Sequence, residues 1–225
     1  MLKTIKIEVQ NTSFDFSYPS EEENMILSVL NGKEYPLDYV TIVRKNPIII
    51  DVGSNCGASV LFFKLNYPDA VISCYEPCLN TFNLLNDNLN QLNNVKTNNC
   101  GLWNKKGEFR LNYGLQKLTG SFSLNEWEED NGGEYVTTKL LSDEINNLEG
   151  HKVDLLKIDV EGAEVEIMYE LFSNIKSHMI ENIFLEYHGQ VIKNALIEDF
   201  STMYKVKEIV GGKEQGVLLF FNEHS

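Results

Sequence analysis

Side chains that could do chemistry occur at four points of the chain, each directly after a short apolar run. They are Asp51 with Gly53, Glu76, Asp159 with Glu161, and His188. A carboxylate can accept hydrogen bonds from a ribose diol or bind an ammonium group, and an unperturbed histidine titrates near neutrality and can accept a proton. One such residue alone is more simply a capping or solvated group, but four on one rim of a fold predict a ligand site.

The apolar runs before these residues predict the strands of a buried sheet. We expect strands at residues 48–50, 70–75, 95–99, 153–158 and 183–187, and helices at 58–65, 77–92, 165–172 and 191–203. This alternation predicts an α/β, Rossmann-like fold with a doubly wound, mostly parallel sheet. Ligands of such folds bind beyond the carboxyl ends of the strands, where the strand order reverses, so all four points should meet there.

Further elements are expected at both ends of the chain. Residues 1–45 predict an N-terminal β-hairpin followed by a short helix at 25–30, which Ser20 and Glu23 would cap. Residues 46–225 form the main domain of this prediction, and the two parts are treated as one structural unit. That domain would close with an antiparallel hairpin of residues 204–210 and 217–222.

The pattern is weaker between residues 105 and 147. Here we expect an edge strand at 109–111, a loop at 120–123, a solvated acidic face at 126–130 and a short strand at 135–138. We expect this irregular stretch and the N-terminal segment to decide which molecule binds beside a cofactor.

Composition restricts the partners. The chain has 19 Lys and Arg against 33 Asp and Glu, a formal charge of −14, which disfavours nucleic acid and anionic membranes as partners. Residues 1–8 interrupt their apolar residues with charges, and no later run reaches membrane-spanning length, so a cytoplasmic protein is expected. A homo-oligomer is compatible with the sequence, which does not define the oligomeric state.

The cysteines do not predict a metal site. They stand at positions 56, 74, 78 and 100, without a second closely spaced pair and without a cluster of histidines nearby. Reduced, partly buried thiols are therefore expected, and no metal is assigned from the sequence.

The loop after the first strand points to one kind of cofactor. Gly53 and Gly57 allow positive φ angles or close backbone approach, but position 55 is Asn, so the glycine that lets a pyrophosphate approach is missing. Asp51 would repel phosphate yet could receive an ammonium group, directly or through water, and Glu76 is placed to hold a ribose. S-adenosylmethionine has an ammonium group and a ribose but no phosphate.

With these residues the chain resembles the FkbM-type S-adenosylmethionine-dependent methyltransferases, whose members methylate hydroxyls of sugars and polyketide-like natural products. The resemblance covers roughly residues 46–190. It is carried by Asp51-Val52-Gly53-Ser54-Asn55-Cys56-Gly57, Tyr75-Glu76-Pro77, Lys157-Ile158-Asp159-Val160-Glu161-Gly162-Ala163-Glu164 and Leu185-Glu186-Tyr187-His188. Ser54 replaces the alanine common in the family, a mild departure.

The resemblance implies a fold of the class I methyltransferase type and a role for each residue. The cofactor would be held by Asp51, Gly53, Ser54, Asn55 and Gly57 at the methionine part, Glu76 and Pro77 at the ribose, and Cys100, Gly101 and Leu102 at the adenine. Asp159 and Glu161 would lie where the cofactor meets a small-molecule or carbohydrate hydroxyl.

Methyl transfer is an in-line displacement, so the protein must align a hydroxyl and accept its proton. His188, Asp159 and Glu161 are the catalytic residues expected, with His188 as base or, equally, as a residue that only closes the loop. The two carboxylates could orient His188, bind a sugar hydroxyl or hold a divalent cation, but the absence of a third firm ligand in the sequence disfavours the cation.

Two other classes of function stay open. One is a nicotinamide-dependent oxidoreductase, which the missing glycine at position 55 disfavours. The other is a non-catalytic domain that binds an adenosine cofactor, which the full set of rim acids disfavours.

Overall fold

The computed structural model describes residues 1–9, 12–113, 122–123, 133–212 and 214–222. The expected acidic face at 126–130 lies outside these residues. In the described part of the chain, no helix is long and apolar enough to cross a membrane.

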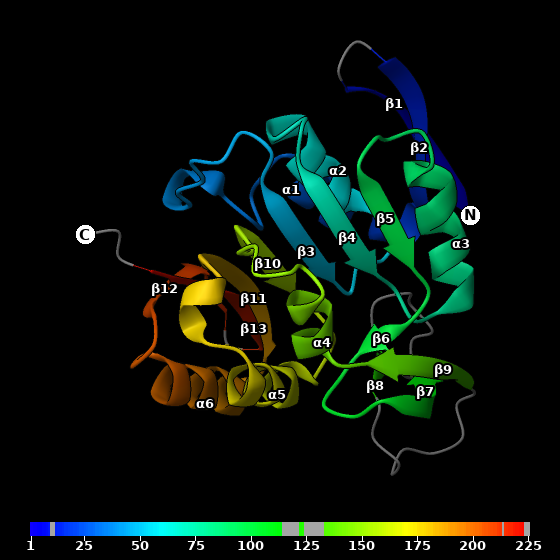
Figure 1. The fold of residues 1–225 in the computed structure, drawn as a ribbon. Helices are drawn as coiled ribbons and strands as arrows, with labels where there is room; N and C mark the ends of the chain where they lie inside the picture. Colours follow the sequence, from blue (N-terminus) through cyan, green and yellow to red (C-terminus); the bar gives the residue numbers. More distant parts are fainter. Residues whose placement is uncertain (10–11, 114–121, 124–132, 213, 223–225) are drawn as a thin grey trace.

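A sheet of seven strands forms the centre of the molecule (Figure 1). Its order is β12 (Lys205–Val210), β13 (Gln215–Phe221), β11 (Asn182–His188), β10 (Leu155–Ile158), β3 (Ile48–Val52), β4 (Val71–Tyr75) and β5 (Val95–Asn98). Each neighbouring pair from β11 to β5 is parallel, whereas β13 runs antiparallel to β11 and to β12. The doubly wound sheet and the C-terminal antiparallel hairpin are thus confirmed, and the strand order reverses between β3 and β10.

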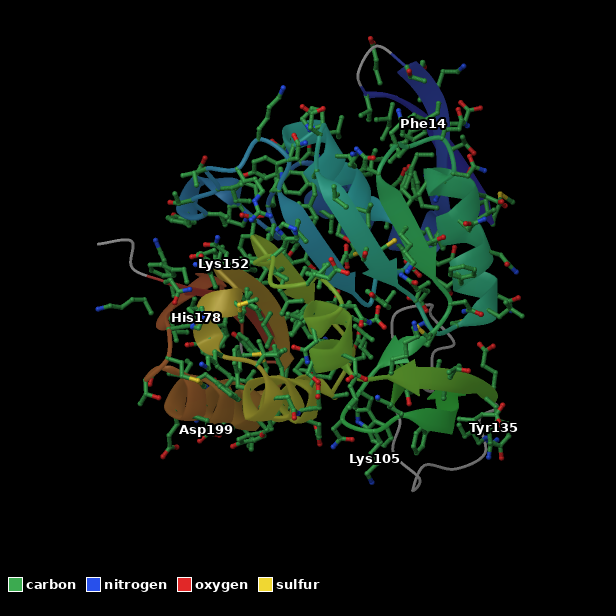
Figure 2. All side chains as sticks on the ribbon, in the orientation of Figure 1. Phe14, Lys105, Tyr135, Lys152, His178 and Asp199 are labelled. Atoms are coloured by element: carbon green, nitrogen blue, oxygen red, sulfur yellow. The ribbon has the colours of Figure 1, made fainter. Side chains whose placement is uncertain are left out.

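Helices cover both faces of this sheet. They are α2 (Ala58–Asn66), α3 (Leu79–Leu89), α4 (Leu141–Asn146), α5 (Glu164–Asn174) and α6 (Gln190–Phe200). Successive strand residues point to opposite faces, so Ile49 packs in the core with α2 and α3, and Ile50 in the core with α4, α5 and α6. Side chains fill the space between sheet and helices (Figure 2).

The N-terminal segment adds a two-stranded antiparallel sheet and a helix, as expected. These are β1 (Leu2–Val9), β2 (Thr12–Pro19), the 3-10 turns Ser20–Glu22 and Leu37–Tyr39, and α1 (Glu23–Leu30). The hairpin is fixed to α3 because the Asn88 amide accepts from the Ser17 N–H at 2.9 Å and donates to the Ser17 carbonyl at 2.8 Å. The expected cap is wrong: Ser20 donates to Glu21 and begins a 3-10 turn, while Glu23 pairs with Lys3.

A second, four-stranded sheet lies at the ends of β4 and β5, whose arrowheads point toward it (Figure 1). Its order is β6 (Gly101–Leu102), β9 (Gly133–Lys139), β7 (Gly107–Tyr113) and β8 (Phe122–Ser123). The strands expected at 109–111 and 135–138 are confirmed as parts of β7 and β9, but residues 122–123 form a strand where a loop was expected. The sequence pattern did not predict that these strands form a sheet of their own.

Candidate functional site

A cavity of about 470 Å³ opens at the carboxyl ends of β3, β4 and β10. This size is typical of small-molecule sites. Its wall contains the loop residues 53–55, 76–77 and 159–161, with 101–102 of β6 and Val136 and Thr138 of β9 on one side. The N-terminal segment contributes Asn24, Met25 and Ser28 of α1 together with Glu34 and Tyr35. The cavity therefore lies where the strand order reverses.

Gly53 and Gly57 are glycines for different reasons. A Cβ on Gly53, whose φ is +76°, would lie 1.7 Å from the Asp159 carbonyl oxygen, so glycine lets the loops after β3 and β10 touch at the cavity wall. A Cβ on Gly57, whose φ is +97°, would lie 3.0 Å from Leu85 and 3.1 Å from Leu89. Gly57 thus lets α2 begin against α3, and it is not part of the cavity wall that was expected for it.

Glu76 presents a buried carboxylate to the cavity. Only 4% of the residue is exposed, the Asn55 N–H donates to Oε2 at 3.0 Å and the Cys78 N–H donates to Oε1 at 2.9 Å. Burial raises the pKa of Glu76 to about 7, against the effect of these two hydrogen bonds. Because an ionised carboxylate has about four lone-pair sites, each oxygen can still accept a hydrogen bond from a ligand hydroxyl.

Asn55 adds an unused acceptor beside Glu76. Its side-chain Oδ1 is buried and finds no hydrogen-bond partner in the described part of the chain, and the residue lines the cavity. A buried acceptor without a partner is costly unless a ligand supplies a donor. The Asn55 oxygen is thus suited to an ammonium group.

Asp51 lies beneath the cavity and does not line it. It is fully buried, accepts a hydrogen bond from Ser59 at 2.5 Å, and has Oδ1 3.3 Å from the Lys157 ammonium. Burial raises the pKa of Asp51, although Lys157 and Ser59 act in the opposite direction. The cation beside Asp51 is therefore a lysine of the chain itself, where the sequence had suggested the ammonium group of a ligand.

Lys157 of β10 is a cavity residue that the sequence analysis missed. It is 2% exposed, donates to the Gly53 carbonyl at 2.5 Å, and lies 3.4 Å from Asp159 Oδ2. Burial alone would lower its pKa, but Asp51 and Asp159 hold the pKa above its ordinary value, so Lys157 is charged. The available signal was a single lysine inside the apolar run Leu155-Leu156-Lys157-Ile158.

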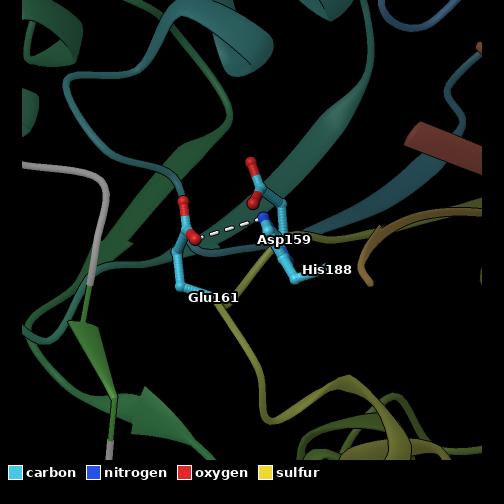
Figure 3. A group of neighbouring side chains, drawn as sticks. All are labelled: Asp159, Glu161 and His188. Atoms are coloured by element: carbon cyan, nitrogen blue, oxygen red, sulfur yellow. Dashed lines mark ion pairs between the residues drawn. The ribbon is translucent and has the colours of Figure 1, made fainter. Parts of the chain in front are cut away.

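Asp159, Glu161 and His188 form a cluster at the edge of the cavity (Figure 3). One ligand atom of each lies within 4.8 Å of those of the other two. The His188 Nε2 is 3.1 Å from Glu161 Oε2, and its Nδ1 is 2.8 Å from Oε1 of the fully buried Glu164. Asp159 and Glu161 line the cavity, whereas His188 does not.

The environment of this cluster changes its proton affinities. Burial raises the pKa of Glu161 to about 7. Burial would lower the pKa of His188, but the hydrogen bond to Glu164 and the charge of Glu161 outweigh it and raise that pKa to about 9. Without a further ligand, His188 is thus mostly protonated at neutral pH, which differs from the near-neutral titration expected from the sequence. Burial also raises the pKa of the cavity residue Glu186.

The structure places most of the expected site residues around one cavity. Those that line the cavity are Gly53, Ser54, Asn55, Glu76, Pro77, Gly101, Leu102, Asp159 and Glu161; those that do not are Asp51, Gly57, Cys100 and His188. Cys100 packs in the core with Tyr75 and Leu141. All four cysteines are buried and free, as expected. Besides Lys157, the sequence analysis did not single out Glu186, and it expected the N-terminal segment at the site without naming the α1 residues that line the cavity.

Comparison with known proteins gives a consistent result. The family model described as "Methyltransferase FkbM domain" matches residues 51–207, more than half of the chain. Methyltransferase sdnD of Sordaria araneosa is 29% identical over 185 residues, which cover 68% of this chain and 66% of sdnD. The 2-O-methyltransferase NoeI of Sinorhizobium fredii (strain NBRC 101917 / NGR234) is 23% identical over 199 residues, or 80% of this chain and 82% of NoeI. The matched part thus spans just under two thirds of sdnD.

A solved structure shares the fold. The crystal structure of Methyltransferase FkbM from Methylobacillus flagellatus KT aligns with a TM-score of 0.60 at 12% identity, over 85% of this chain and 47% of that chain. At this identity the likeness supports the arrangement of strands and helices only.

Proposed function

Because this chain belongs to the FkbM methyltransferase family, we propose that it is an S-adenosylmethionine-dependent O-methyltransferase acting on a hydroxyl of a sugar or similar small natural product. The observation that carries the proposal is one cavity lined both by Glu76 and by the Asp159 and Glu161 pair. The name of the relative NoeI, a 2-O-methyltransferase, supports oxygen as the methylated atom.

The residues of the cavity fit S-adenosylmethionine. Glu76 would accept hydrogen bonds from the two ribose hydroxyls, the unpartnered Asn55 oxygen would accept from the ammonium group, and Gly101 and Leu102 would border the adenine. No phosphate has to be bound, which agrees with the acidic wall. When bound, this cofactor supplies a methyl group activated on a sulfonium.

The carboxylates of the cluster suit a hydroxyl-bearing acceptor. Asp159 and Glu161 can each accept a hydrogen bond from a hydroxyl. The ion pair of Lys157 with Asp159, at 3.4 Å, fixes the position of the Asp159 carboxylate. His188 holds Glu161 through the 3.1 Å contact. Aligning the acceptor at this cluster and allowing its proton to leave is the work left to the protein, because displacement at a methyl group needs mainly orientation.

The oxidoreductase alternative is not favoured, because the family is one of methyltransferases and the loop has Asn55 where a dinucleotide fold needs glycine. A non-catalytic cofactor-binding domain is separated from an enzyme by the test that follows.

The test is a screen of sugars and other hydroxyl compounds with isotope-labelled S-adenosylmethionine, with products read by mass spectrometry and cofactor binding read by calorimetry. We expect a product carrying one labelled methyl group on oxygen, and loss of cofactor binding in Glu76→Ala. Methylation at nitrogen or carbon alone would contradict the proposed acceptor atom. Tight binding of the cofactor without any product would instead support the non-catalytic alternative.

A further inference from the structure

The cluster of Asp159, Glu161 and His188 has the geometry of a metal site. Two ligands on one ion with bonds of about 2.2 Å lie at most about 4.4 Å apart. The three ligand atoms lie within 4.8 Å of one another, and ligands of a tetrahedral ion with such bonds lie roughly 3.6 Å apart, so shifts of less than about 1 Å bring all three onto one ion. Their side chains extend from the loop after β10 and the end of β11, two neighbouring strands of the central sheet.

A buried carboxylate orients the histidine of this cluster. The Nδ1 atom of His188 lies 2.8 Å from Glu164 Oε1, which also accepts a hydrogen bond from the Gly162 N–H at 3.0 Å. With Nδ1–H donated to Glu164, Nε2 is the ring nitrogen that faces Glu161. Histidines that bind metals almost always donate their other N–H in this way, commonly to a carboxylate.

Even with His188 protonated, carboxyl groups outnumber the cations around its ring. Glu161, Glu164 and Glu186 have oxygens within 3.8 Å of its ring nitrogens, and Asp159 completes the group. The nearby cation Lys157 is shared between Asp159 and the buried Asp51. Moreover, Oε2 of Glu164, a residue with no exposed surface, is without a hydrogen-bond partner in the described part of the chain. A divalent cation would supply the missing positive charge.

From these observations we propose that Asp159, Glu161 and His188 bind one divalent transition-metal ion at the cavity wall. An imidazole with two carboxylates suits Mn²⁺, Fe²⁺, Co²⁺ or Zn²⁺ better than an all-oxygen ion such as Ca²⁺. Three protein ligands would leave coordination positions open, as in catalytic metal sites, and two of the three ligands, Asp159 and Glu161, line the cavity.

The ion would add a step to the proposed methyl transfer. The catalytic role of the ion therefore rests on the proposed function. At the open positions it would coordinate the acceptor hydroxyl, hold the oxygen in line for transfer and lower the pKa of that hydroxyl. The hydroxyl proton would pass to water in the cavity, the new bond would form between that oxygen and the methyl carbon, and the carbon–sulfur bond would break. Under this proposal His188 binds the metal ion and does not contact the acceptor, which agrees with its absence from the residues that line the cavity.

The test measures Mn²⁺ binding to the cofactor-free protein by electron paramagnetic resonance of the remaining free ion. We expect one Mn²⁺ per chain and binding at least tenfold weaker in Glu161→Gln, which changes a partly exposed side chain and leaves the core intact. Glu164→Gln, one step removed from the ion, should weaken binding about 10- to 100-fold. Glu166→Gln makes the same charge change at an exposed position of α5 and should bind as the wild type does.

Equal Mn²⁺ binding in the wild type and Glu161→Gln, or no binding to the wild type, would overturn the proposal. Circular dichroism of each variant checks that a loss of binding is not a loss of fold. A methyl-transfer assay with and without a chelator separates the two proposals. Turnover unaffected by chelator would refute the metal's role and leave the methyltransferase standing, whereas site-specific Mn²⁺ binding without methylation of any hydroxyl would refute the function and leave the ion site.

Discussion

Replacing Gly53 by alanine should disable the site through one contact. The added Cβ would lie 1.7 Å from the Asp159 carbonyl oxygen, whereas real Cβ contacts are not shorter than 3.0 Å, so the loops after β3 and β10 must separate by about 1.3 Å. Asp159 moves with that loop. Misplacement of a reacting group by about 1 Å can cost on the order of 100-fold in rate, and we expect a loss of kcat of that size.

The stability of the same variant has two contributions. The φ of +76° costs a non-glycine residue about 1–2 kcal/mol, and forcing the loops apart costs a further 1–3 kcal/mol, roughly as overpacking does. Gly150→Ala is the matched control, since its φ is +86° but a Cβ there meets nothing within 4 Å. For a chain of this size about 1 kcal/mol corresponds to roughly 2–4 °C in melting temperature, so Gly53→Ala should lose about twice as much as Gly150→Ala.

The assays are differential scanning fluorimetry and labelled methyl transfer at saturating cofactor. Gly150→Ala should show the smaller loss of melting temperature and full activity. If Gly53→Ala matches Gly150→Ala in both assays, the inferred contact between the two loops does not hold.

Three further predictions concern single side chains of the cavity. Burial raises the pKa of Glu76 from 4.5 to about 7, so the contribution of Glu76 to stability is full below pH 4.5 and is lost as the pH rises through about 7. The melting temperature of the cofactor-free wild type should therefore fall over that pH range relative to Glu76→Gln. Parallel curves of melting temperature against pH for the two proteins would contradict this prediction. His188→Ala should abolish transfer while calorimetry shows cofactor affinity unchanged, because His188 does not line the cavity; retained turnover would refute its role. Lys157→Met leaves Asp51 buried and unpaired and should lower the free energy of unfolding in urea by about 3–5 kcal/mol. Adding Asp51→Asn should restore part of that stability. A double mutant no more stable than Lys157→Met alone would argue against the pairing.

The strand-end acids were predictable because they depend on local pattern and on one rule about parallel sheets. Glu76 and Asp159 each follow an apolar run, and the carboxyl ends of parallel strands meet at one edge of the sheet. Lys157 was not predictable in this way. It lies beside Asp51 because β10 pairs with β3 in the register that sets these two residues opposite each other, and nothing local shows which strands are neighbours.

Glycine was ambiguous for a similar reason. Gly53 and Gly57 look alike in sequence, yet one allows contact with the Asp159 backbone and the other makes room for Leu85 and Leu89. The difference depends on which partner arrives from a distant segment. The small sheet was missed likewise, because its strand β6 pairs in parallel with β9, and thirty residues lie between the two strands.

The N-terminal segment changes what counts as the unit of this protein. The family match begins at residue 51, but Phe16, Tyr18 and Ile26 are buried in the same core as Leu61 and Phe63 of α2, and α1 contributes to the cavity wall. A fragment that begins at residue 51 would lack Phe16, Tyr18 and Ile26. The α2 side chains that pack against this core would then be exposed to water. The stretch that comparison between relatives recognises is therefore shorter than the stretch that shares one core and one cavity lining.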